Sequence, residues 1–205
     1  MDRVMKYLTI VVTSVVLYIF PMIIQAAWAP TSMVVFGDGA SDNGRTYLTY
    51  NIPITPPYWH GRFSNGPVWA ERVAYQLDLS PNPAEYPSYT RGRYFLDYAQ
   101  YLSTILHADL AAFPVEYEPI TLADQIQEYI NTTHPIAGNT LVFIWIGIND
   151  YYASSCLKNP LDCNSDILQS LIVSIDRLYR YGVRHIVLMS FPLNEYQSCS
   201  KLWLS

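Results

Sequence analysis

The sequence predicts an α/β fold in which a parallel, doubly wound sheet is flanked by helices. Short apolar runs at residues 33–36, 140–146 and 185–190 read as strands, and segments with helical spacing lie between them. This alternation favours a parallel sheet with right-handed crossovers. The first run ends in a turn rich in Gly, Asp and Asn, at the end of a strand where open α/β sheets present ligands.

Composition limits the classes of function. The 205 residues suit a single folded domain, and 51% apolar with 14% charged residues argues against disorder. A net charge of −5 offers no basic patch, so no nucleic-acid partner is expected. The 18 tyrosines and five tryptophans fit a tyrosine-rich core and surface, or contacts with sugars or lipid head groups.

Residues 1–29 have the layout of a secretory signal peptide. Arg3 and Lys6 precede an apolar run from Leu8 to Ile24, and small residues suited to cleavage follow at positions 26–29. We therefore expect export through a Sec-type signal to the periplasm or the medium, with residues 30–205 forming the domain. Because the apolar run is long, an uncleaved membrane anchor is the alternative.

In the first half of the domain, residues 33–36 are the first strand. Tyr47 to Pro57 is predicted as an irregular loop because its prolines are incompatible with a helix. A helix is predicted to begin at Pro67, and a loop from Ser80 to Arg93. The apolar face of this helix consists of Val68, Trp69, Val73, Ala74 and Leu77.

The second half continues the alternation. Tyr94, Tyr98 and Tyr101 recur at helical spacing, which predicts a helix to about His107. The remaining elements are a loop at 111–119, a helix at 122–130, a strand at 140–146, a loop at 151–164, a helix at 166–180 capped by Gly182, and a strand at 185–190.

The sequence contains three cysteines. Cys156 and Cys163 bracket a short loop and could form a local disulfide, which leaves Cys199 unpaired. No pair has the spacing of a zinc site, so neither a metal site nor a cofactor is expected.

Residues 37–44 read GDGASDNG. This turn resembles the first block of the GDSL (also called SGNH) ester hydrolases, Gly-Asp-Ser-x-Ser-Asp-x-Gly, and differs only where Gly39 replaces the nucleophilic Ser. The resemblance implies a flavodoxin-like SGNH hydrolase fold and hydrolysis of acyl esters. Aromatic residues around Trp59 and Phe63, with the expected export, are most similar to the secreted bacterial lipolytic branch: phospholipases, lysophospholipases and glycerophospholipid acyltransferases.

Two further blocks support the resemblance. Residues 62–69 (RFSNGPVW) are similar to the second block, whose Gly corresponds to Gly66, and residues 147–150 (GIND) are similar to the third, whose Asn corresponds to Asn149. The resemblance implies that the N–H groups of Gly39 and Gly66 and the amide of Asn149 form an oxyanion hole. Glycine permits close approach and asparagine supplies a neutral donor. Taken singly, Gly66 could be a helix-start turn and Asn149 an Asx turn.

The catalytic base is also missing from the matched pattern. The family ends in Asp-x-x-His, and none of His60, His107, His134 and His185 has Asp three residues before it. A family member continues with a further strand and a helix bearing that block, so we expect this domain to lack them. After the second block, family members commonly have an Ala-x-Gly-Gly-Ala-like segment. Tyr98 to Tyr101 stand near that place, without the Gly pair.

Other residues of the turn are not expected to replace the nucleophile. Ser41 lies two residues beyond Gly39, and in a tight turn its side chain points elsewhere. Asp38 and Asp42 are expected to cap the turn by accepting backbone N–H bonds. Nothing else in the sequence supports paired-carboxylate chemistry of the glycosidase type.

Three functions remain open. The chain is a GDSL-type ester hydrolase by resemblance, predicted inactive because both nucleophile and base are missing. Alternatively it is a non-catalytic protein that binds a lipid or a glycan, or a decayed fragment. The expected partner is an acyl ester or lipid, with membrane contact only through the N-terminal segment or that substrate.

Overall fold

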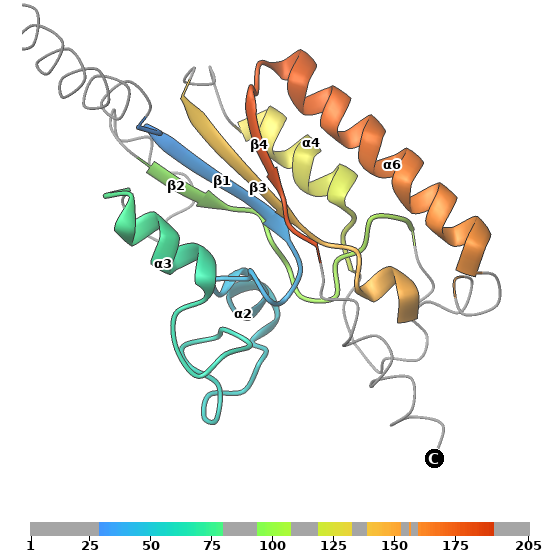
Figure 1. Ribbon diagram of the computed structural model, residues 1–205. Helices are drawn as coiled ribbons and strands as arrows, with labels where there is room; N and C mark the ends of the chain where they lie inside the picture. Colours follow the sequence, from blue (N-terminus) through green and yellow to red (C-terminus); the bar gives the residue numbers. More distant parts are fainter. Residues whose placement is uncertain are drawn as a thin grey trace, which may run out of the picture. The chain divides into compact units, whose positions relative to one another are not determined.

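The structure is a computed structural model that describes residues 29–79, 94–107, 119–132, 139–152, 156 and 160–190. Its centre is a parallel four-stranded sheet (Figure 1). The strands are β1 (Ser32–Gly37), β2 (Tyr94–Asp97), β3 (Thr140–Trp145) and β4 (His185–Leu188), in the order β2-β1-β3-β4. The predicted α/β class with a parallel sheet is therefore confirmed.

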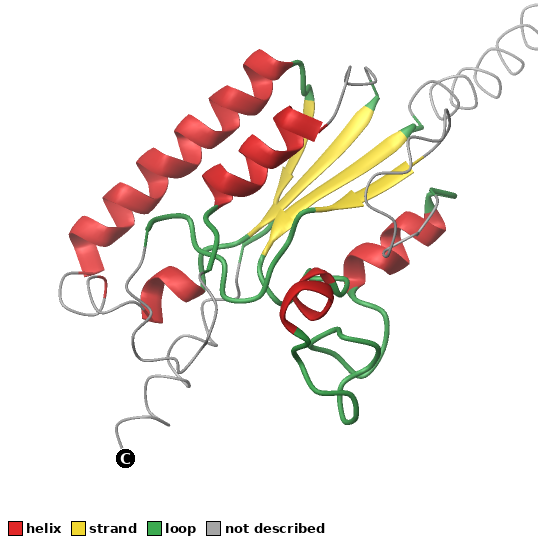
Figure 2. Ribbon diagram, turned by 180° about the vertical axis from the view of Figure 1, so that it is seen from behind, coloured by secondary structure: helices red, strands yellow, loops and turns green. Residues whose placement is uncertain are grey.

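Helices cover both faces of this sheet. They are α2 (Arg45–Tyr50), α3 (Trp69–Gln76), α4 (Leu122–Thr132) and α6 (Pro160–Tyr181), with a short 3-10 helix, η1 (Asn149–Tyr152). Helices α4 and α6 lie on one side and α3 on the other, as Figures 1 and 2 show from opposite directions. This layering explains why β1 is buried along its whole length.

Alternate residues of β1 enter two separate cores. Val34 and Phe36 pack with Ile126 and Tyr129 of α4. Met33 and Val35 of β1 point to the other face and pack with α3 and β2 in the second core. The buried members of this core are Met33, Val35, Val68, Ala70, Ala74, Leu79 and Phe95. The period-two alternation of a strand thus fixes which helix each side chain meets.

The path of the chain creates a switch point between β1 and β3. After β1 the chain moves to β2 on one side, and it then returns across β1 to form β3 on the other side. The two strands pair from Ser32 with Thr140 to Gly37 with Trp145. Their carboxyl ends therefore adjoin, which is where doubly wound sheets bind ligands.

One predicted helix is wrong. Residues 94–97 form strand β2, paired with β1 from Ser32↔Tyr94 to Val35↔Asp97, and residues 98–107 form no helix. The tyrosine spacing that suggested a helix also suits a strand followed by a loop. Pairing with a distant strand, which periodicity does not record, decides between them.

Three element boundaries also differ from prediction. Tyr47 to Tyr50 belong to α2, because the Asp42 carboxylate accepts the N–H groups of Gly44 and Arg45 and so starts a helix before the prolines end it. Helix α3 begins at Trp69, two residues after Pro67. Helix α6 begins at Pro160, inside the predicted loop.

Several expectations lie outside the described residues. They concern the N-terminal segment through residue 28, the loops at 80–93 and 111–118, His134, and the tail that contains Cys199. Among the helices that the structure does describe, none is both long and apolar enough to cross a bilayer.

Candidate active site

Two aspartates organise the turn after β1. Asp38 Oδ1 accepts the N–H of Ala40 at 3.0 Å, and the Asp38 carbonyl accepts the N–H groups of Ser41 and Asp42, each at 3.0 Å. Asp42 caps α2 with Oδ1, while its Oδ2 accepts the N–H of Tyr101 at 3.2 Å. Hydrogen bonds therefore stabilise the turn internally and connect it to the loop after β2.

Asp38 is a buried carboxyl next to Gly39. Its side chain is 3% exposed, and within the described chain its Oδ2 has no hydrogen-bond partner. Burial raises the pKa of Asp38 to about 6, against the lowering effect of the Ala40 N–H. Burial likewise raises the pKa of Asp150, which follows β3. These carboxyls are thus shifted towards their neutral forms.

An aromatic pair covers Gly39. The rings of Phe63 and Tyr101 stack with their centroids 3.9 Å apart and an interplanar angle of 20°. A Cβ built on Gly39 would lie 2.8 Å from Cδ2 of Tyr101 and 3.7 Å from Cδ2 of Phe63. Carbon atoms normally approach no closer than about 3.5 Å. The Tyr101 ring therefore occupies the space that a side chain at position 39 would need.

Ser41 is placed away from that position. It is fully buried, and its Oγ accepts the indole N–H of Trp69 at 3.1 Å. The same Oγ would lie 2.9 Å from a Cβ on Gly37, so this turn packs tightly against the end of β1. The hydroxyl holds α3 to the turn.

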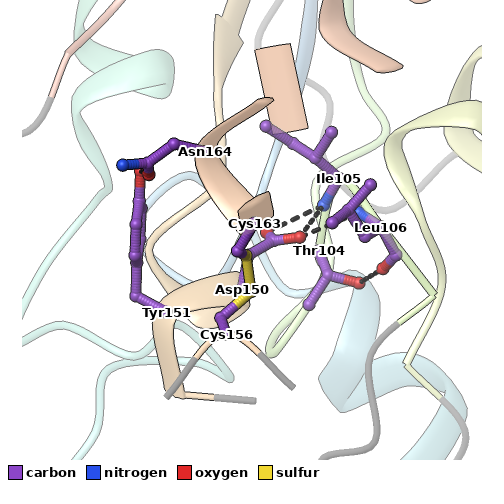
Figure 3. The surroundings of a disulfide bond; sticks show 8 residues. All are labelled: Thr104, Ile105, Leu106, Asp150, Tyr151, Cys156, Cys163 and Asn164. Atoms are coloured by element: carbon purple, nitrogen blue, oxygen red, sulfur yellow. Dashed lines mark hydrogen bonds between the residues drawn. A yellow bond between two sulfur atoms is a disulfide. The ribbon is translucent and has the colours of Figure 1, made fainter. Parts of the chain in front are cut away.

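Asn149 begins η1 at the end of β3. Its Nδ2 donates to the carbonyl of Ser103 at 2.9 Å, and its side chain is buried. The adjacent Asp150 accepts the N–H of Ile105 at 2.9 Å and that of Leu106 at 2.8 Å (Figure 3). One loop, residues 98–107, therefore contacts Gly39 through Tyr101 and Asn149 through Ser103.

Gly66 lies in the segment between α2 and α3. A Cβ at this glycine would meet only Nη2 of Arg72, at 3.6 Å. A buried ion pair holds the segment in place: Arg62 Nη2 donates to Glu71 Oε1 at 2.7 Å, and Glu71 Oε2 accepts the N–H of Val68 at 2.9 Å. The second glycine is thus on an anchored loop whose Phe63 reaches Gly39.

Figure 3 also shows the disulfide between Cys156 and Cys163. The Cα atoms are 5.2 Å apart, and the bond joins the segment after η1 to the first turns of α6. The Tyr151 hydroxyl donates to Oδ1 of Asn164 at 2.7 Å beside it. No group of three or more His, Cys, Asp or Glu side chains in the described segments could hold a metal ion.

The described histidines have separate surroundings. His60 is exposed and packs edge-on against Trp59, with ring centroids 4.7 Å apart. His107 is exposed at the end of the loop after β2, and His185 opens β4. None of them belongs to an Asp-x-x-His sequence.

Sequence reasoning missed the ring pair of Phe63 and Tyr101 and placed Tyr101 on a helix. The resemblance held a signal, because it puts Gly39 at the position of the family's serine and Tyr101 near a segment of small residues. The structure brings Gly39 and Asn149 to adjoining strand ends, with the Tyr101 ring against Gly39.

Comparison with known proteins agrees with the motifs. The family model described as GDSL-like Lipase/Acylhydrolase matches residues 33–201. A phosphatidylcholine-sterol acyltransferase from Aeromonas hydrophila is 28% identical over 167 residues, which cover 78% of this chain and 44% of the relative. The chain thus spans less than half the length of that relative. From the match over most of its length, the chain belongs to the GDSL-like lipase/acylhydrolase family.

Proposed function

We propose that this chain binds acyl esters of the lipid type at the carboxyl ends of β1 and β3 and does not hydrolyse them. The N–H groups of Gly39 and Gly66 and the amide of Asn149 would hold the ester carbonyl. The observation that carries the proposal is the Tyr101 ring, 2.8 Å from where a Cβ on Gly39 would be. A donor set without a nucleophile can bind an ester carbonyl but cannot form an acyl-enzyme.

The ligand class follows from the family and from the aromatic surroundings. Tyr58 extends the ring pair, with its centroid 5.8 Å from that of Phe63, and it is 41% exposed. Such rings suit an acyl chain or a lipid head group. The relative is named for its action on phosphatidylcholine, which makes a glycerophospholipid the first ligand to test.

The first test measures turnover. The full chain is expected to hydrolyse p-nitrophenyl butyrate no faster than buffer, because removing the nucleophile of a serine hydrolase costs roughly 10⁶-fold in rate. Gly39→Ser is expected to remain inactive as well, since its Cβ would meet Tyr101 and the sequence holds no Asp-x-x-His base. Ester turnover by the unaltered chain would contradict the proposal.

The second test measures binding. Titration with a non-hydrolysable ether analogue of lysophosphatidylcholine should change the fluorescence of Trp59, Trp69 or Trp145. Asn149→Ala should weaken this binding, whereas Asn131→Ala, at an exposed position on α4, should leave it unchanged. A folded chain that binds no lipid would favour the decayed-fragment interpretation instead.

A further inference from the structure

Exposed apolar side chains are concentrated in residues 47–61, which we name the apolar loop. This segment comprises the end of α2 and the chain that follows it (Figure 1). Leu48 is 67% exposed and Ile54 is 75% exposed, and Tyr50 and Tyr58 are exposed as well. A single exposed apolar side chain is ordinary, whereas four of them within residues 48–58 are typical of an interaction surface.

The apolar loop is closed on itself. A Cβ built on Gly61 would overlap the side chain of Tyr47, so the two ends of the loop are in contact. The Gly61 N–H donates to Oγ1 of Thr55 at 3.3 Å, and the Asn51 N–H donates to the carbonyl of Tyr47 at 2.8 Å. Compact surface loops whose ends meet in this way are frequently functional. The exposed apolar side chains therefore belong to an ordered loop.

The charges around the apolar loop are already paired. Between Arg45 and Arg62 the sequence has no Asp, Glu, Lys or Arg. Arg45 forms an ion pair with Glu128, and Arg62 forms one with Glu71 at 2.7 Å. A charged partner would find no complementary Asp, Glu, Lys or Arg on this loop. An uncharged or zwitterionic surface requires none, so the loop fits a surface of that kind.

The backbone of the apolar loop suits a lipid environment. Three of its residues have no N–H group: Pro53, Pro56 and Pro57. The N–H groups of Asn51 and Trp59 already donate to backbone carbonyls. A backbone donor without a partner is costly in lipid, because lipid tails supply no acceptor. A protein partner can supply acceptors, so the small number of free donors favours lipid.

Aromatic rings connect the apolar loop to the candidate site. The Tyr58 ring packs on Phe63, and Phe63 stacks on Tyr101, whose ring lies against Gly39. Tyrosine and tryptophan are enriched where proteins meet the surface of a bilayer, since their rings have an apolar body and a polar tip. A lipid surface in contact with this loop would thus adjoin the carboxyl end of β1.

From these observations we propose that the apolar loop docks on a zwitterionic lipid surface such as a phosphatidylcholine bilayer. Leu48 and Ile54 enter the acyl region, and Tyr50 and Tyr58 lie at the level of the head groups. A stable protein interface takes about 20–30 residues from each partner, which is more than this loop contains. The choice of lipid rests on the proposed function, to which docking adds the route by which a bilayer lipid reaches the ester site.

Fluorescence quenching tests whether the loop enters lipid. With phosphatidylcholine vesicles whose acyl chains carry bromine, full-length Ile54→Trp should be quenched more strongly than the unaltered chain. The matched control is Ile172→Trp, at a 52% exposed position on α6, which should add no quenching. Because bromine quenches only on close approach, the result does not depend on how other segments contact the vesicle. Equal quenching of the two variants would overturn the proposal.

Vesicle sedimentation measures how much the loop contributes. Leu48→Ser/Ile54→Ser should lower the partition constant of the full chain by at least about tenfold, because two aliphatic side chains no longer leave water. Leu168→Ser/Ile172→Ser removes the same two side chains from exposed positions on α6 and should change the constant by less than about twofold. Circular dichroism and Tm establish that both variants fold. Equal losses in the two would contradict docking by the loop.

A soluble ligand separates docking from binding at the ester site. A short-chain ether analogue of lysophosphatidylcholine, kept below its critical micelle concentration, should bind Leu48→Ser/Ile54→Ser as tightly as the unaltered chain. Binding of this analogue without quenching of Ile54→Trp would overturn the docking proposal and leave the proposed function standing. Quenching of Ile54→Trp without binding of the analogue would support docking and contradict the ester site. Failure of both would overturn both.

Discussion

At the scale of single residues, the Tyr101 ring restricts which side chains position 39 can hold. The φ of Gly39 is not in the left-handed region, so its backbone accepts an L side chain. The obstacle is the Tyr101 ring alone. The Tyr101 ring thus fills the space that a side chain at position 39 would need.

Gly39→Ala should therefore destabilise the chain only while Tyr101 is present. We expect a loss of about 1–3 kcal/mol from overpacking in the unaltered background. In a Tyr101→Ala background the same change should be neutral or stabilising by up to about 1 kcal/mol, because alanine restricts the unfolded chain. Urea unfolding of the four proteins measures both values.

Gly66→Ala provides the control for this cycle, since its Cβ would have only Arg72 nearby, at 3.6 Å. It should change the free energy of unfolding by less than about 0.5 kcal/mol in either background. Equal costs of Gly39→Ala with and without Tyr101 would show that another contact restricts position 39.

Asp38 should make stability depend on pH. Its folded pKa of about 6 exceeds the unfolded value of 3.8, so the folded state favours the protonated carboxyl. The stability that this preference provides is complete below pH 3.8 and is lost as pH rises through 6, with a total of about 3 kcal/mol. Asp38→Asn should remove this dependence, because an amide does not titrate in this range. Its oxygen can still accept the Ala40 N–H, so the turn should keep its form.

The measurement is the free energy of unfolding of both proteins between pH 3.5 and pH 7.5. Burial also raises the pKa values of Asp42, Asp97 and Asp150. These groups are common to both proteins, so the difference reports Asp38 together with its charge coupling to Asp42 and Asp150. Between pH 4 and pH 7, the free energy of unfolding of the variant should rise relative to that of the unaltered chain. A difference that stays constant would show that the Asp38 carboxyl is not perturbed.

At the scale of secondary-structure elements, Gln125 connects α4 to the end of β1. The Gly37 N–H donates to Gln125 Oε1 at 2.9 Å, and Gln125 Nε2 donates to the Gly37 carbonyl at 2.8 Å. The side chain is fully buried. Because β1 ends there, this amide satisfies two backbone groups directly before the turn that carries Gly39.

Gln125→Ala should cost about 2–4 kcal/mol, because two buried backbone groups lose their partners. The turn should also loosen, which hydrogen exchange at Ala40 and Ser41 would report. Gln127→Ala is the control on the same helix, since Gln127 is exposed, and it should cost under about 0.5 kcal/mol. Similar losses for both variants would indicate that α4, and not the end of β1, determines stability.

The sequence predicted the elements whose signals are local. β1 and β3 are apolar runs, and Gly182 ends α6 with a φ of 117°, as its position after the helix indicated. β2 was not predictable in this way, because four residues become a strand only through pairing with β1. Likewise, the start of α2 depends on the side chain of Asp42, not on helical periodicity.

The positions of the candidate site residues in the fold were predictable from the sequence blocks, but their packing was not. Motif order places Gly39 and Asn149 after neighbouring strands, and the register of β1 with β3 brings these strand ends together. The stacking of Phe63 on Tyr101 joins segments 38 residues apart in the chain, which no local pattern encodes. The anchoring of residues 105 and 106 by Asp150 is non-local for the same reason.

At the scale of the whole molecule, charge should select the lipid surface. The chain has a net charge of −5 and a calculated pI of about 5.2. An acidic protein is repelled by anionic bilayers over about one Debye length, roughly 10 Å at 0.1 M salt. If the chain binds lipid as proposed, attraction must come from the aromatic rings and the carbonyl donors, which do not require anionic head groups.

We therefore expect phosphatidylcholine vesicles to bind the full chain at least about tenfold more tightly than phosphatidylglycerol vesicles at low ionic strength. Raising salt to about 0.5 M should narrow this difference by screening the repulsion, without weakening the phosphatidylcholine binding. Vesicle sedimentation at both salt concentrations measures the two effects. A preference for phosphatidylglycerol that salt abolishes would instead require a cationic surface, and the composition of this chain argues against one because acidic residues outnumber basic ones by 17 to 12.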